Sequence, residues 1–206
     1  MEELLKNIPH IEEIAHRGAF TGTEPKRTAT FQERASKQNK VLPSLEDAIR
    51  ATGLRDGMTI SFHHHFRGGV HVVNHVVDTL ARMGFKNLTL AASSLAAVHA
   101  PLIEHIKNGV ITHIETSGLR GELAEQVSRG LMDCPVVFRS HGGRAAAIRS
   151  GELHIDVAFL GAPSCDSYGN ANGYSRDDDD SIACGSMGYA RTDAKYADKV
   201  VILTNH

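Results

Sequence analysis

The residues best equipped for chemistry lie in TISFHHHFRGG, at positions 59–69. An imidazole can ligate a metal or bind an anionic substrate, and a guanidinium fork matches a carboxylate. Glycine N–H groups between a strand and a helix can approach a ligand closely and bind an oxyanion. The candidates are His63, His64, His65, Phe66, Arg67, Gly68 and Gly69.

The histidines could in principle bind a metal ion. His63 and His65 lie on the same side of a continuing strand, and His71 and His75 stand four residues apart on a predicted helix, a spacing that can chelate zinc. The residues between that pair, 72–74, do not form HExxH, and no paired carboxylate or cysteine accompanies either set. We therefore expect no metal site. The loop histidines are assigned a structural or substrate-binding role, and His71 and His75 an exposed helix face.

By themselves, Gly68 and Gly69 are weak evidence for a ligand-binding loop, because they fit neither GxGxxG nor a Walker A loop and suit a plain turn equally well. The evidence is stronger because three other predicted loops are also rich in glycine and polar residues: TSGLRG (116–121), SHGG (140–143) and GAPSCDSYGNANG (161–173). In the last segment, Asn170 and Asn172 either tolerate left-handed backbone or bind a ligand, and both readings stay open. The segment lacks GxSxG, and Cys165 has no partner histidine at a diagnostic position.

Composition excludes several classes of protein. The chain has 206 residues, 41% hydrophobic and 22% charged, with a net charge of −2, so no strong field draws it to nucleic acid or to a membrane surface. No apolar run approaches the roughly 20 residues that a membrane span needs. Three widely spaced cysteines without CxxC favour a reducing, cytoplasmic setting over a disulfide scaffold.

The elements that position these residues alternate along the chain. Short apolar strands are predicted at DGMTISF, NLTLAAS, VITHIET, PVVFRS, IDVAFLGA and KVVILTN, with helices between successive strands as far as IDVAFLGA. This pattern predicts an α/β fold with a mostly parallel sheet flanked by helices, over residues 41–206, behind an irregular N-terminal arm at 1–40. The polar, glycine-rich loops then gather at the carboxyl ends of the strands, where such sheets bind ligands.

Several long motifs carry a family resemblance. DGMTISFHHHFRGG, HAPLIEHIKNGVITHIETSGLRGELAEQVSRGL and SGELHIDVAFLGAPSCDSYGNANG resemble the amino-terminal half of the citrate lyase alpha subunits, members of the CoA-transferase family. The acidic run SRDDDD, residues 175–180, departs from the family pattern. Since DKVVILTNH stops just after a predicted buried strand, we also expect the chain to continue beyond residue 206 into a second α/β half.

The resemblance implies a citrate CoA-transferase that exchanges acetyl for citryl on an acyl-carrier thioester in the cytoplasm. Its substrates would be citrate and a carrier bearing CoA or a CoA-like group, with no other bound cofactor, and its partners the beta (lyase) and gamma (carrier) subunits. Phe66, Gly68 and Gly69 match the thioester-facing loop, and the nucleophilic glutamate belongs to the absent second half. Substrate-binding roles fall to His63, His64, His65, Arg67, Ser117, Gly118, His141, Gly142, Gly143, Asn170 and Asn172.

Two alternatives remain at this stage. Glu115, at a predicted strand end, is the best carboxylate within the chain, although a structural role suits it better than a nucleophilic one. The chain could also be a non-catalytic binding or assembly domain that holds carrier and partner subunits while the chemistry occurs elsewhere.

Overall fold

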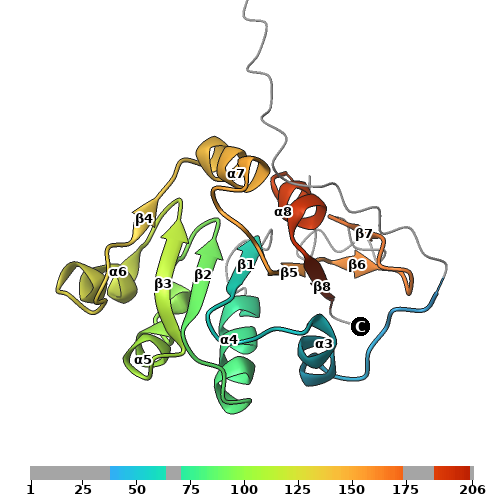
Figure 1. Cartoon of the computed structure of the whole chain (residues 1–206), viewed down its shortest axis with the longest axis horizontal. Helices are drawn as coiled ribbons and strands as arrows, with labels where there is room; N and C mark the ends of the chain where they lie inside the picture. The colour runs from blue at the N-terminus through green and yellow to red at the C-terminus, as the bar shows by residue number, and fades with distance from the viewer. Residues whose placement is uncertain (1–37, 64–70, 174–187, 205–206) are drawn as a thin grey trace, which may run out of the picture.

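A six-stranded sheet forms the centre of the molecule (Figure 1), and the computed structural model describes residues 38–63, 71–173 and 188–204. The strand order is β4-β3-β2-β1-β5-β8, and each neighbouring pair is parallel, which confirms the predicted architecture. The strands are β1 (Thr59–His63), β2 (Leu88–Ala92), β3 (Ile111–Thr116), β4 (Val137–Phe138), β5 (Val157–Gly161) and β8 (Lys199–Leu203).

In the described part of the chain, helix α3 (Leu45–Thr52) precedes β1, and five further α-helices and one 3-10 turn lie between the strands. Capping explains why α3 forms where the sequence predicts. Ser44 Oγ accepts a hydrogen bond from Asp47 N at 3.0 Å, and Gly53 ends the helix with φ 72°. The bounds are α3 (Leu45–Thr52), α4 (Val72–Arg82), η1 (Ala97–His99), α5 (Leu102–Lys107), α6 (Gly121–Ser128), α7 (His141–Ser150) and α8 (Ala190–Tyr196).

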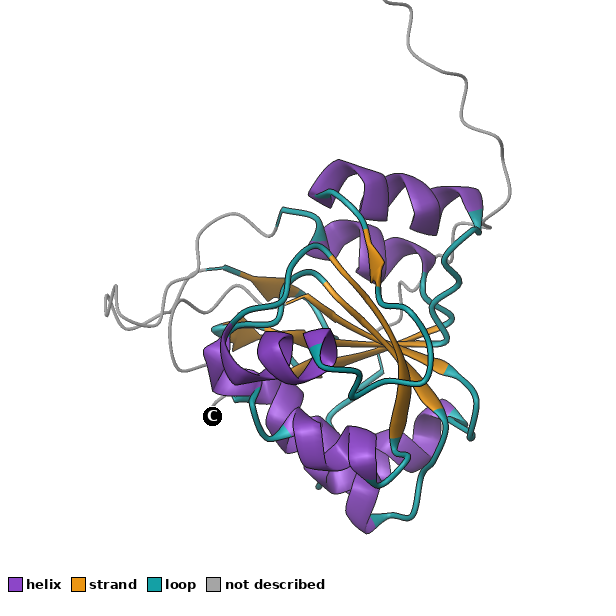
Figure 2. Ribbon diagram, turned by 90° about the vertical axis from the view of Figure 1, so that its left-hand side faces the viewer, coloured by secondary structure: helices purple, strands orange, loops and turns teal. Residues whose placement is uncertain are grey.

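Both faces of the sheet are buried (Figure 2). Along β5, Val157 and Phe159 join the core under α3, α4, α5 and α6, whereas Ala158 and Leu160 join the core under α7 and α8. This alternation follows from the two-residue period of a strand. The rings of Phe62 and Phe159 stack 5.6 Å apart in the first core, so neighbouring strands also interlock through their side chains.

The segment after β5 folds into a small hairpin of its own. Strands β6 (Ser164–Cys165) and β7 (Ala171–Asn172) pair antiparallel and form a second, two-stranded sheet. Lys40 N donates to Ser167 O at 2.8 Å, which holds the described beginning of the chain beside this hairpin. Within the three described ranges, no helix combines the length and the apolar character that a bilayer crossing requires.

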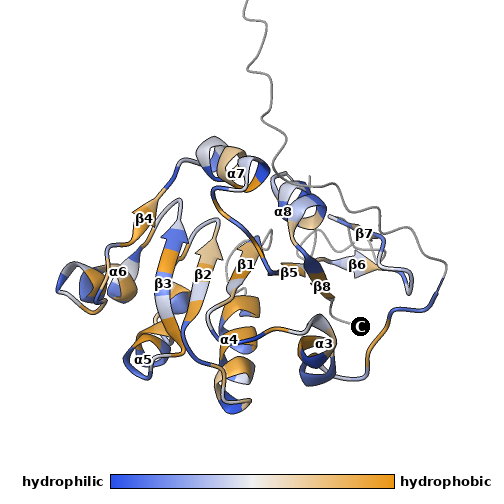
Figure 3. Ribbon diagram, in the orientation of Figure 1, coloured by the Kyte–Doolittle hydropathy of each residue, from blue (hydrophilic) through white to orange (hydrophobic). Residues whose placement is uncertain are grey.

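Hydropathy colouring shows polar and apolar residues alternating along helices such as α3 and α7, as expected of helices that pack one face against a core (Figure 3). Some large apolar side chains nevertheless face solvent, notably Phe138 of the edge strand β4, which is 60% exposed. The predicted arm at 1–40 falls almost entirely outside the described residues.

Candidate functional site

The carboxyl edge of the sheet brings the loops after β2 and β3 together with the segment that leads into α7. Leu95 N donates to Gly118 O at 2.9 Å, which joins the first two loops. Arg139 N donates to Thr116 O at 3.0 Å, which joins the end of β3 to the chain just before α7. Backbone hydrogen bonds therefore fix Ser117 and Gly118 next to the start of α7.

Ser117 offers a hydroxyl at this edge. Its Oγ is buried and has no hydrogen-bond partner among the described residues. Burying a hydroxyl without a partner costs free energy, so the position suits contact with a polar group supplied from elsewhere. The neighbouring Gly118 N–H donates within the turn to Thr116 Oγ1 at 3.3 Å.

His141, Gly142 and Gly143 form the first turn of α7. Ser140 caps the helix, because its Oγ accepts from Gly143 N at 3.0 Å. His141 and Gly142 are exposed, and the His141 ring lies 6.3 Å from that of Tyr189. The partial positive charge at the start of a helix favours a negatively charged group near its first N–H groups. This position therefore suits the anionic ligand that the sequence predicts.

His63 ends β1 at the same edge and is 8% exposed. Its Nδ1 lies 3.9 Å from Asp193 Oδ2 of α8, so the residue at the start of the predicted histidine loop contacts a helix that is not predicted from the sequence. The rest of that loop, His64, His65, Phe66, Arg67, Gly68 and Gly69, lies outside the described residues.

A buried ionic network beneath this edge joins three elements. Arg144 of α7 holds Asp193 of α8 through two hydrogen bonds of 2.9 and 2.7 Å, and the two side chains are 3% and 0% exposed. Ser61 of β1 accepts from Arg144 Nη2 at 2.7 Å and also bonds to Asp193. A bidentate arginine–carboxylate pair is geometrically demanding, so the network fixes α7 and α8 against β1.

Sequence reasoning missed this network. One signal was available: Ser61 interrupts an apolar strand on the same side as His63, and a buried hydroxyl needs a partner. The identity of that partner was not readable, because Arg144 and Asp193 lie 49 positions apart on separate helices.

Asn170 and Asn172 lie in the hairpin and support its backbone. Asn170 donates to both carboxylate oxygens of Asp166, from its backbone N at 2.9 Å and from Nδ2 at 2.8 Å, and these bonds lower the pKa of Asp166. Asn172 Oδ1 accepts from Ser164 Oγ at 2.9 Å. The left-handed position in this turn is Gly169, with φ 86°. Neither asparagine therefore supplies the left-handed residue, and these bonds organise the turn.

The in-chain nucleophile candidates are poorly suited to attack. Glu115 Oε2 accepts from Arg139 Nε at 2.8 Å, and Arg139 Nη1 also reaches Glu152 at 2.9 Å. The hydrogen bond that Arg139 donates to Glu115 is the main reason that the pKa of Arg139 is raised. Burial, and then the charge of Asp166, raises the pKa of the Cys165 thiol, which disfavours its reactive thiolate.

Comparison with known proteins gives one consistent result. Residues 38–206 match the family model of the citrate lyase alpha subunit. The chain is 63% identical over 171 residues to the citrate lyase alpha chain of Haemophilus influenzae, covering 83% of this chain and 33% of that one. It is 59% identical over 175 residues to that of Escherichia coli, covering 85% and 34% respectively. The chain thus spans about a third of the length of the curated relatives it matches.

The fold agrees with a solved relative. A Streptococcus mutans structure, assigned as the alpha subunit of citrate lyase and solved in complex with citrate, is 49% identical and aligns with a TM-score of 0.81. The alignment covers 97% of this chain and 39% of that one.

Proposed function

The chain belongs to the citrate lyase alpha-subunit family, and we propose that it forms part of a citrate CoA-transferase. In the proposed reaction the acetyl group of an acyl-carrier thioester is exchanged for citryl, which yields citryl-carrier and free acetate. The carrier's CoA-like thiol is a substrate, and no other cofactor is needed. The observation that carries the proposal is the family match over residues 38–206, together with a relative solved in complex with citrate.

The proposed chemistry divides between this chain and the rest of the subunit. A glutamate outside these 206 residues attacks the thioester, because the best in-chain carboxylate, Glu115, is held by Arg139. Each tetrahedral intermediate carries an oxyanion that needs positioned N–H donors. We assign that role to the backbone of Phe66, Gly68 and Gly69.

Substrate recognition follows from the chemistry of the edge. Arg67 pairs with a citrate carboxylate, because its fork matches that group. The first turn of α7 and the Ser117 hydroxyl face the acyl-carrier side as donors to polar atoms. In the proposed assembly the chain works with a beta (lyase) subunit and a gamma (carrier) subunit in the cytoplasm.

Gly68→Val tests the thioester loop in the full-length subunit. The added side chain blocks close approach of the backbone, so turnover should fall at least 10-fold while the thermal unfolding midpoint stays the same. Ala51→Val, an exposed position on α3, is the matched control and should retain full turnover. Unchanged turnover in Gly68→Val would remove this loop from the mechanism.

The non-catalytic alternative makes a different prediction. An assembly domain would bind the carrier and lyase subunits with equal strength in wild type and Gly68→Val, and Gly68→Val would not change turnover. Parallel pull-down and turnover measurements on the same two proteins separate the two functions.

A further inference from the structure

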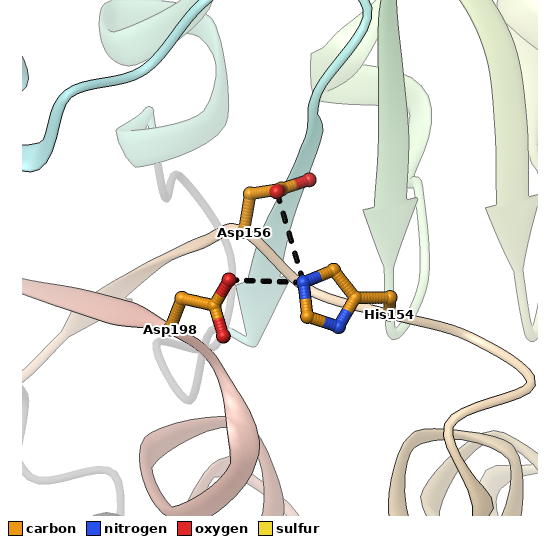
Figure 4. Close-up of side chains that lie close together, drawn as sticks. All are labelled: His154, Asp156 and Asp198. Carbon is orange, nitrogen blue, oxygen red and sulfur yellow. Dashed lines mark hydrogen bonds and ion pairs between the residues drawn. The ribbon is translucent and has the colours of Figure 1, made fainter. Parts of the chain in front are cut away.

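Three potential metal ligands converge at the amino edge of the sheet, opposite the candidate functional site (Figure 4). His154 and Asp156 immediately precede β5, and Asp198 immediately precedes β8. The His154 Nε2 atom lies 3.0 Å from Asp198 Oδ2 and 3.7 Å from Asp156 Oδ1. One nitrogen therefore faces oxygens from the residues that precede two separate strands.

The backbone holds the two aspartates in place. Strands β5 and β8 are paired, and at their beginnings Asp198 N donates to Ile155 O at 3.0 Å while Lys199 N donates to Asp156 O at 2.9 Å. Asp156 Oδ2 accepts from Thr59 N at 2.8 Å, which leaves Oδ1 directed at the imidazole. The sheet thus fixes the backbones of both aspartates, and the bond from Thr59 also fixes the carboxylate of Asp156.

The spacing of these atoms suits a bound metal ion as well as an ion pair. The imidazole nitrogen makes a good hydrogen bond to Asp198, but the 3.7 Å distance to Asp156 is too long for one. Zinc bonds of about 2.0–2.2 Å to nitrogen and oxygen place neighbouring tetrahedral ligands about 3.3 Å apart. That spacing falls between the two distances seen here, so a metal would need only small side-chain shifts.

We propose that His154, Asp156 and Asp198 form a surface site for a divalent transition-metal ion, with Zn²⁺ as the best fit. One imidazole nitrogen and two carboxylate oxygens are a donor set that suits Zn²⁺ better than the all-oxygen sites preferred by Mg²⁺ and Ca²⁺. Water completes the tetrahedron, since the His154 side chain is 59% exposed. The ion joins the beginnings of β5 and β8, and this inference does not rest on the proposed function.

Calorimetric titration of the 206-residue chain with Zn²⁺ alone tests the site. Because the chain has 13 histidines, which can bind zinc elsewhere, the readout is the difference between variants. His154→Gln and Asp198→Asn should each lose one zinc equivalent or bind it at least 10-fold more weakly. His105→Gln is the matched control, because His105 also faces an aspartate, Asp78, at 2.6 Å without a third converging ligand in the described structure, and it should change neither quantity.

A site-resolved measurement on the unmutated chain tests the site even if the variants fail to fold. Substoichiometric Co²⁺ should broaden the backbone amide signals of residues 154–157 and 198–199, and excess Zn²⁺ should restore them. The proposal is overturned if all four proteins bind zinc with the same stoichiometry and affinity, or if these amides respond only at millimolar metal. Either result would leave a plain ion-pair cluster.

Discussion

At the residue scale, Arg139 and Arg144 near the carboxyl edge each bind carboxylates of the protein itself. Arg139 binds Glu115 and Glu152, and Arg144 binds Asp193, so both guanidinium groups are already engaged within the fold. An anionic substrate at this edge therefore needs another cation. Arg67 is the arginine of the predicted histidine loop, two residues after His65, which is why the proposed citrate contact is assigned to it.

Arg67→Ala should raise the KM for citrate in the full-length subunit by about 10- to 100-fold. A charge-assisted hydrogen bond contributes roughly 1.5–3 kcal/mol, and 1.4 kcal/mol is tenfold in affinity. The KM for the acetyl-carrier should change less than about twofold, because the carrier is recognised elsewhere. Arg55→Ala, an exposed arginine in the loop before β1, should alter neither constant. Equal effects on both substrates would exclude a citrate-specific contact.

At the element scale, the position of α7 and α8 depends on the network of Ser61, Arg144 and Asp193. These two helices contribute mostly small apolar side chains to their core, including Ala147, Ala190 and Ala194. Small side chains bury little apolar area, so the ion pair has a large part in fixing how the helices sit. The predicted donors in the first turn of α7 are positioned through it.

Arg144→Met should lower the free energy of unfolding by about 3–5 kcal/mol, since it leaves a buried, unpaired carboxylate. Arg191→Ala, an exposed arginine on α8, should change it by less than about 0.5 kcal/mol. The double variant Arg144→Met with Asp193→Leu should lose less than the sum of the single losses, because it removes both charges. Urea denaturation followed by circular dichroism measures all four, and additive losses would show that the pair is not coupled.

The start of α6 has little room for a side chain. A Cβ added to Gly121 would lie 2.9 Å from the Ala97 backbone, at φ 65°, whereas one added to Gly109 at φ 70° would meet open space. Both alanine variants strain a left-handed residue by about 1 kcal/mol, and only Gly121→Ala adds the clash. We expect thermal unfolding to show a clearly larger loss for Gly121→Ala than for Gly109→Ala. Equal losses would mean that η1 shifts freely.

Periodicity explains which of these elements the sequence could predict. The strand around Phe159 is apolar on both faces, which marks a parallel sheet regardless of distant contacts. By contrast, α8 buries mainly Ala190 and Asp193, so it has no apolar stripe to recognise. The hairpin at 164–172 has two-residue strands, too short for alternation to appear.

The site was predictable only in part, for the same reason. Loop positions such as Ser117 and His141 follow from the order of strands, and the structure places both at the carboxyl edge of the sheet. The Arg144–Asp193 pair depends on packing between distant segments, and a single sequence does not show which distant residues pack together. The roles assigned to residues 64–69 stay predictions.

At the scale of the whole molecule, the chain spans about a third of its curated relatives, as the 33% coverage of the Haemophilus influenzae protein indicates. The described edge offers hydrogen-bond donors in the first turn of α7 and at Ser117, whereas its carboxylate Glu115 is held by Arg139. Transfer activity is therefore expected of the full-length subunit and not of these residues alone.

The most direct test supplies the full-length subunit that contains this chain with acetyl-carrier and isotopically labelled citrate. Label should appear on the carrier as a thioester, and one acetate should be released for each citryl group transferred. The 206-residue chain by itself should give no transfer. Carrier that stays unlabelled with the intact, folded subunit, or acetate release that does not depend on citrate, would contradict the proposed citrate CoA-transferase.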